Sequence, residues 1–156
     1  VITGAADRLA AAPEKLRALV YVDAFVPSAG ERVSDHMPQA ARAALAARLA
    51  AGDPAYPPVP ARFFGLSDPE DIAWVEARLT AQPAATYFQP LRLDRALPAT
   101  VRRAYVACES PRLAAFDATK ARVRANPAWA FHALQTGHDA MITAPADLAA
   151  LLIRLA

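Results

Sequence analysis

The chain has 156 residues, which is enough for one domain with a sizeable hydrophobic core. Its formal net charge is only +2, and its scattered arginines form no basic stripe with interleaved aromatics, so we expect no nucleic-acid partner. No apolar run approaches the roughly 20 residues that a membrane-spanning helix requires, so we expect no membrane partner either.

The single cysteine, Cys108, rules out an internal disulfide and favours a reducing compartment. The abundance of alanine and arginine is typical of bacteria with GC-rich genomes. No signal peptide is visible, and we expect a cytoplasmic protein. The chain begins at Val1 rather than at methionine, so we expect its natural start to lie further upstream.

The first 27 residues predict a helix followed by a strand. Residues 2–15 are typical of the end of a helix, which Pro13 closes. Residues 16–25 form a nearly continuous apolar run with valine and tyrosine, which predicts a strand buried in a parallel sheet. Asp23 lies near the end of this run.

Residues 28–97 carry many of the prolines and predict helices but no strand. Residues 40–51 predict an alanine-rich helix that Gly52 ends. Asp68 is placed to cap a second helix, with Pro69 in its first turn. The apolar stripe expected on this second helix consists of Ile72, Trp74, Val75 and Leu79.

The last part of the chain alternates between strands and helices. We expect a strand over 104–108, a helix over 112–125, a strand over 129–134 and a helix over 145–155. Together with the first strand, this alternation predicts an α/β fold in which helices cover a parallel sheet.

A Gly137–His138 turn follows the last predicted strand. The imidazole of His138 would therefore lie at the carboxyl edge of the sheet. A histidine in that position can act as a general base and then as a general acid.

Two segments carry a resemblance to a known family. The sequence LVYVDAFVP over 19–27 and GHDAM over 137–141, with a helical insertion between them, resemble the α/β-hydrolase superfamily. They are most similar to the group of plant methyl esterases, hydroxynitrile lyases and bacterial esterase relatives. The resemblance covers nearly the whole chain and implies the C-terminal half to two thirds of such an enzyme.

The resemblance implies a division of the chain into core and lid. Residues 1–27 would hold the helix after the nucleophile and the sixth strand of the hydrolase sheet. Residues 98–156 would hold the seventh and eighth strands and the C-terminal helix. Residues 28–97 would form a helical lid over the site.

The chain lacks the Gly-x-Ser-x-Gly elbow that carries the nucleophile in this superfamily. The resemblance places that elbow just before Val1. We therefore expect a fragment, whose nucleophile and oxyanion hole lie on a missing N-terminal part of the same protein. The serines without the required glycines are Ser28, Ser34, Ser67 and Ser110.

The acid that orients His138 has several candidates. Most relatives carry it after the seventh strand, where this chain reads CESPR over 108–112 and has no aspartate. The superfamily's other location is the end of the sixth strand, where Asp23 lies, with a purely structural role as its alternative. Asp23 is our first candidate and Glu109 the second, while Asp117 or no acid at all stays open.

Five apolar side chains are predicted to contact the substrate. Three are aromatic residues of the lid that either wall an apolar pocket or pack the lid on itself. The other two flank the proposed acid and base. The five are Phe25, Phe64, Trp74, Phe88 and Met141.

The remaining histidines and Asp139 have structural interpretations. His36 fits a solvated surface position, His132 fits a strand position, and Asp139 fits an acceptor at a helix start. The spacing of histidine, cysteine and acidic residues matches no metal site, and the chain has no glycine-rich phosphate loop. We therefore expect neither a metal nor a cofactor.

The combined prediction is a cofactor-independent serine-type hydrolase that acts on a small ester, lactone or related acyl substrate with an apolar portion. The missing serine would attack the carbonyl, His138 would move its proton, and Asp23 would orient His138. Two alternatives stay open: a C–C or cyanohydrin lyase with the same histidine as base, and a non-catalytic small-molecule receptor. The oligomeric state is also open, with a homodimer among the options.

Overall fold

The computed structural model describes residues 1–155, and its centre is a three-stranded parallel sheet with the strand order β1-β4-β5. The strands are β1 (Ala18–Val22), β4 (Arg102–Cys108) and β5 (Ala130–Leu134). Residues 104–108 of the middle strand β4 are all buried, as expected for a parallel strand covered on both faces. The predicted α/β class is confirmed, and the carboxyl ends of the three strands lie along one edge of the sheet.

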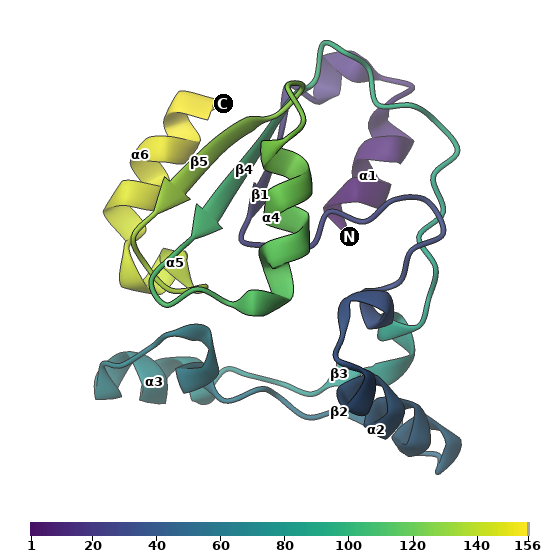
Figure 1. Ribbon diagram of the computed structural model, residues 1–156, viewed down its shortest axis with the longest axis vertical. Helices are drawn as coiled ribbons and strands as arrows, with labels where there is room; N and C mark the ends of the chain where they lie inside the picture. The colour runs from purple at the N-terminus through teal and green to yellow at the C-terminus, as the bar shows by residue number, and fades with distance from the viewer. Residues whose placement is uncertain (156) are drawn as a thin grey trace.

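Helices cover both faces of this sheet (Figure 1). On one face lie α1 (Ile2–Leu9) and α4 (Asp117–Arg124). On the other face lie α5 (Ala140–Thr143) and α6 (Pro145–Leu155). The result is a three-layer arrangement of helix, sheet and helix.

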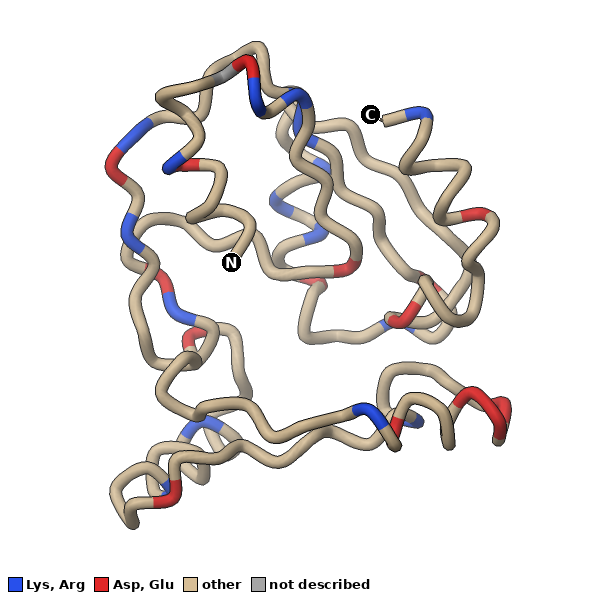
Figure 2. Tube along the Cα trace, turned by 180° about the vertical axis from the view of Figure 1, so that it is seen from behind, with Lys and Arg blue, Asp and Glu red and all other residues tan. Residues whose placement is uncertain are grey.

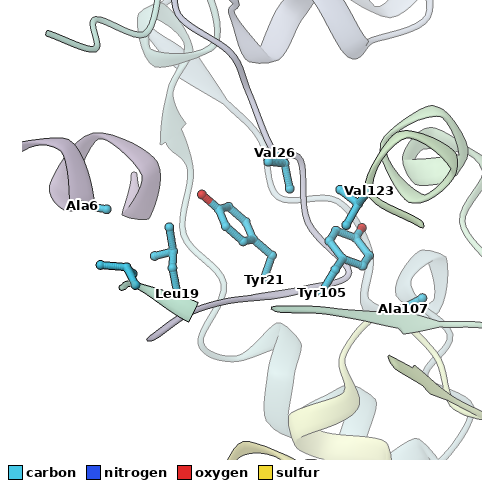
Figure 3. Packing of buried hydrophobic residues seen from close by; sticks show 8 residues of the cluster. Ala6, Leu19, Tyr21, Val26, Tyr105, Ala107 and Val123 are labelled. Carbon is cyan, nitrogen blue, oxygen red and sulfur yellow. The ribbon is translucent and has the colours of Figure 1, made fainter. Parts of the chain in front are cut away.

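The alternation of side chains along the strands divides the core in two. Tyr21 and Tyr105 point from neighbouring strands toward the layer of α1 and α4 (Figure 3). Val22 at the end of β1 and Cys108 at the end of β4 point to the opposite face and pack with α5 and α6. Tyr105 is fully buried, and its hydroxyl donates a 3.0 Å hydrogen bond to the carbonyl oxygen of Ala24. This bond ties the middle strand to the loop that follows β1.

The segment 28–97 leaves the sheet after β1 and returns before β4 (Figure 1). It contains α2 (Gln39–Ala50), α3 (Pro69–Glu76) and an antiparallel pair of strands, β2 (Ala55–Tyr56) and β3 (Gln82–Pro83). The expectation that this segment has no strand is therefore wrong. Each strand has only two residues, so no alternating pattern could mark it in the sequence.

Short 3-10 turns connect these elements. They are η1 (Pro13–Lys15), η2 (Val33–His36), η3 (Ala61–Phe64), η4 (Ala84–Tyr87) and η5 (Ala114–Phe116).

Three predicted elements are shorter in the structure than in the sequence pattern. The helix expected over 2–15 divides into α1 and the turn η1, since Pro13 disfavours helical geometry at the residue before it. The strand expected over 16–25 reduces to β1, and the helix expected over 112–125 divides into η5 and α4.

Helix α3 begins as the sequence predicts, because the side chain of Asp68 accepts two backbone N–H groups of its first turn. The apolar stripe is only partly correct. Ile72 and Val75 pack inward, but Leu79 lies beyond the end of the helix and Trp74 is 53% exposed.

Figure 2 shows basic and acidic positions interspersed along the chain rather than gathered into one basic stripe. No helix within residues 1–155 is long and apolar enough to cross a membrane.

Removal of the Tyr105 hydroxyl should destabilise the fold more than removal of the Tyr21 hydroxyl. Tyr105→Phe leaves the carbonyl of Ala24 without its donor, which should lower the free energy of unfolding by about 1 to 3 kcal/mol. Tyr21 bonds only to the hydroxyl of Thr3, at 2.8 Å, which can turn to another partner, so Tyr21→Phe is the matched control. Urea denaturation measures both, and equal losses would contradict this account.

Candidate active site

Asp23 follows β1 directly and lies at the carboxyl edge of the sheet with no exposed surface. Its backbone N–H donates a 2.7 Å hydrogen bond to the carbonyl oxygen of Val106, so the residue is still held by the middle strand. Its φ angle is +41°, a left-handed conformation that few non-glycine residues adopt, although aspartate tolerates it better than most. Strained backbone of this kind is frequent at functional sites, where the surrounding structure holds it in place.

His138 reaches Asp23 from the loop that follows β5. The distance from its Nδ1 to Oδ2 of Asp23 is 2.9 Å, and the side chain of His138 is 24% exposed. These residues lie 115 positions apart in the sequence and meet because β1 and β5 flank the same middle strand.

The loop that carries His138 is held by residues of the segment 28–97. The backbone N–H of His138 donates a 2.9 Å hydrogen bond to the carbonyl oxygen of Phe64. Gly137 lies so close to this segment that a Cβ would stand 2.9 Å from that oxygen and 3.1 Å from Cα of Gly65. Gly65 itself has a φ angle of +93°, which favours glycine. Glycine is thus required at both Gly65 and Gly137, where the end of turn η3 meets the loop that carries His138.

Asp23 stays ionised despite its burial. Burial alone would raise its pKa, but hydrogen bonds from His138, Lys120 and the N–H of Cys108, together with the charge of Lys120, hold the pKa of Asp23 below its usual value. Nζ of Lys120 lies 2.9 Å from Oδ1 of Asp23 and donates a 2.8 Å bond to the carbonyl oxygen of Cys108. The carboxylate is therefore satisfied on both oxygens.

Two aromatic rings flank the imidazole of His138. Phe116 stacks on it with ring centroids 5.1 Å apart, and Phe64 lies 5.2 Å away on a tilted plane. Phe116 in turn contacts Phe25, whose ring also stacks on His36. The pair of Asp23 and His138 thus has apolar walls on either side of the ring.

Neither Glu109 nor Asp117, the other acids considered for orienting His138, bonds to its imidazole in the part of the chain that the structure describes. Glu109 is half-buried and lines a cavity of about 720 Å³ on the side of α4, a cavity that His138 does not line. Asp117 pairs with Arg112 at 3.3 Å. Asp139 begins α5 without a side-chain cap, and burial raises its pKa. Of the acids considered, Asp23 is the one that the structure brings to the imidazole.

The structure places some of the residues predicted to contact substrate near His138 and others at exposed or half-buried positions elsewhere. Phe64 lies against His138, and Phe25 lies one ring further away. Met141 is 56% exposed at the start of α5, and Trp74 is exposed with the guanidinium of Arg78 4.1 Å from its ring. Phe88 ends the turn η4 and is half-buried.

Cys108 is not a plausible alternative nucleophile. It is fully buried, and its Sγ approaches only the backbone oxygen of His138, at 3.9 Å. Burial and the negative charge of Asp23 raise the pKa of the Cys108 thiol to about 12, so the thiolate does not form near neutral pH.

The other two histidines do not join this site. His36 lies 3.6 Å from a carboxylate oxygen of Glu31, and Nε2 of His132 is buried on β5 without a hydrogen-bond partner. In the part of the chain that the structure describes, no cluster of histidine, cysteine and acidic side chains could hold a metal ion.

Comparison with known proteins finds relatives in sequence and in fold. No protein-family model matches the chain. A carbendazim hydrolyzing esterase of Nocardioides sp. (strain SG-4G) is 33% identical to the chain over 165 residues, covering 99% of the chain and 66% of the esterase. The chain therefore spans a little under two thirds of the length of this curated relative.

A solved structure shares the fold. It is an extracellular α/β-hydrolase from a Paenibacillus species, described as sharing structural and functional homology with tobacco salicylic acid binding protein 2. The match has a TM-score of 0.70 and 19% identity, and it covers 94% of this chain and 64% of that hydrolase. The chain belongs to the α/β-hydrolase superfamily. It corresponds to the C-terminal portion of that fold, which confirms the predicted resemblance.

Two residues at the site of this α/β-hydrolase are missing from the sequence-based prediction. Lys120 and Phe116 come from α4 and the turn before it, and both are buried. Their spacing of four, with Val123 three residues further on, places all three on one face of a helix. A lysine on the apolar face of a helix was the available signal.

Gly137→Ala should impair any activity of this α/β-hydrolase site that depends on His138, because the new methyl group meets the backbone of Phe64 and Gly65 and must displace the histidine loop. We expect a loss of about 1 to 3 kcal/mol in unfolding free energy, as for other overpacked sites. The imidazole resonances of His138 should also shift in NMR spectra.

Gly4→Ala is the matched control, since a Cβ there meets only the side chain of Leu91 at 3.4 Å and neither glycine has a left-handed φ angle. Unchanged stability and unchanged His138 resonances in Gly137→Ala would show that the close contact of the two glycines is not needed.

Proposed function

We propose that this chain carries the general base and the orienting acid of a serine-type hydrolase that acts on a small ester, lactone or related acyl substrate. The observation that supports this most is the 2.9 Å contact between a buried, ionised Asp23 and His138 at the carboxyl edge of a parallel sheet. The name of the esterase relative and the hydrolase fold of the structural neighbour point the same way.

The geometry assigns separate tasks to the two imidazole nitrogens. An ionised carboxylate only accepts hydrogen bonds, so Nδ1 of His138 must donate to Asp23. In the neutral ring, Nε2 then carries the lone pair. Among residues 1–155 no partner bonds to Nε2, which leaves it free to take a proton from a nucleophile and later return it to the leaving group. Asp23 would stabilise the imidazolium that forms in between.

The nucleophile in this proposal is a serine on residues upstream of Val1. The serines of this chain lack the strand-to-helix elbow that exposes a catalytic hydroxyl, and the thiol of Cys108 stays protonated. The oxyanion donors would come from the same upstream residues.

The substrate would carry an apolar group next to its acyl carbon. Phe64 and Phe116 flank the imidazole with aromatic surface, and Phe25 extends this surface. Segment 28–97 would act as the lid, since its turn η3 supplies Phe64 and holds the backbone of His138. No metal or redox cofactor is needed for this chemistry.

His138→Ala should abolish turnover in the full-length protein, because the base is lost. The fold should stay intact, because the ring of His138 is partly exposed. Loss of a triad member typically reduces kcat by about 10³ to 10⁶. A fluorophosphonate probe, which reacts with an activated serine, should label the wild-type protein and fail to label His138→Ala. Hydrolysis of p-nitrophenyl esters gives the rate.

His132→Ala is the control, since this histidine lies within β5 and away from the carboxyl edge. Labelling and ester hydrolysis that survive in His138→Ala would exclude the proposed base. Labelling of the wild type without ester turnover would favour a lyase, and no labelling at all would favour a receptor.

Asp23→Asn should reduce turnover by roughly 10⁴, the effect known for an orienting aspartate that becomes an amide. The amide can favour the wrong histidine tautomer, and it leaves the ammonium of Lys120 buried without its carboxylate. Stability should therefore fall as well, so the rate must be expressed per folded molecule. Glu109→Gln is the control and should keep near-normal turnover. The reverse ranking would move the acid to the loop after β4.

A further inference from the structure

We propose that Lys120 is a positioning residue for the catalytic pair: its ammonium holds the Asp23 carboxylate ionised and turned toward His138. This inference rests on the proposed function, because Lys120 would influence the protonation of the same base, His138. Lys120 does not touch the imidazole and would act only through Asp23.

The two carboxylate oxygens of Asp23 have different partners. Oδ1 receives Nζ of Lys120 at 2.9 Å and the N–H of Cys108 at 3.2 Å. Oδ2 is left for His138 at 2.9 Å. Because Oδ1 is held from two directions, the carboxylate plane cannot rotate without breaking a charge-assisted bond. The direction in which Oδ2 faces the imidazole is therefore set by Lys120 and Cys108.

Lys120 also joins three elements at the point where the site is built. It projects from α4, bonds to the last residue of β4 at Cys108, and pairs with Asp23 after β1. Its side chain is 7% exposed. A lysine this buried is costly unless it is paired and hydrogen-bonded, and here it has both partners. The backbone N–H of Cys108 already donates to Oδ1, so the charge of Lys120 is the feature to explain.

The charge acts on a pair that titrates as a unit. Asp23 and His138 share a hydrogen bond, so a proton taken up by either residue belongs to the pair. The positive charge of Lys120 opposes that uptake and so keeps the base available at lower pH. The other ionisable groups around the pair are the phenol of Tyr105, the thiol of Cys108 and the carboxylates of Glu109 and Asp139.

The neighbouring groups do not replace Lys120. Burial raises the pKa of Tyr105 and of Cys108, so both stay neutral over the working pH range. Glu109 and Asp139 are acids and would favour proton uptake by the pair rather than oppose it. Among the groups facing Asp23 in residues 1–155, Lys120 is the cation that lies outside the catalytic pair.

The test compares Lys120→Met, which fills similar space without charge, with Lys120→Arg, which keeps the charge. In Lys120→Met, the acid limb of the pH profile of kcat/KM should move to higher pH by about one unit or more, since a cation at this distance lowers the pKa of an aspartate by about 1 to 3 units. Below the limb this corresponds to about a tenfold lower kcat/KM per unit. KM should stay within about twofold, because Lys120 bonds to Asp23 and Cys108 and would act on the rate only through Asp23.

The matched control is Arg124→Met, which removes a cation from the same helix that lies over Phe131 instead of Asp23. It should leave the acid limb in place, and Lys120→Arg should keep the limb near its wild-type position. If Lys120→Met does not fold, Lys120→Gln retains a donor for Cys108 without the charge. An acid limb that stays unchanged while the melting temperature falls would overturn the proposal and leave Lys120 with a structural role only.

A second readout separates this inference from the proposed function. In protein with ¹³C-labelled aspartate carboxyls, the titration midpoint of Asp23 should rise in Lys120→Met and stay unchanged in Arg124→Met, whether or not the protein hydrolyses esters. A midpoint that rises in Lys120→Met, when the wild-type protein shows no hydrolase activity, would refute the proposed function alone. An unchanged midpoint in an active enzyme would refute the role of Lys120 alone.

Discussion

The buried carboxylate of Asp23 is the constraint on which the site depends. It stands where β1 ends, and it must be ionised, hydrogen-bonded and held in a left-handed backbone conformation at once. Each of these costs free energy, and each is offset by a different element: β4 through its backbone, α4 through Lys120, and the loop after β5 through His138. A charge removed from water is tolerated only when all its partners are in place. The three carboxyl ends of the sheet are thereby fixed relative to one another.

The segment 28–97 is tied to this arrangement through its backbone. Phe64 accepts the backbone N–H of His138, and Gly65 meets Gly137 at a distance that leaves no room for a side chain. A segment attached in this way bears directly on the position of the imidazole. It also places one aromatic ring against the base, which couples the shape of the substrate pocket to the orientation of the catalytic group in the proposed mechanism.

The pairing of a lysine with the orienting aspartate distinguishes this site from one in which backbone N–H groups alone support the acid. A neutral donor would orient the carboxylate equally well, but it would not oppose the protonation of the neighbouring base. Lys120 contributes both effects because it is charged and buried. The aromatic rings of Phe116 and Phe64 lie against the imidazole of His138, whose side chain is 24% exposed.

The α/β class, the three parallel strands, the resemblance to the α/β-hydrolases and the candidates Asp23 and His138 could all be predicted from the amino-acid sequence. The class and strands follow from continuous apolar runs, whereas the roles of Asp23 and His138 also rest on the resemblance to the α/β-hydrolases. The folded structure was needed to show which acid meets the imidazole, that Lys120 and Phe116 lie beside Asp23 and His138, and that Trp74 is exposed. It also revealed the short β2–β3 ribbon. The physical reason is that each of these depends on contacts between residues far apart in the chain, and local patterns of hydrophobicity carry no information about which distant side chains will meet.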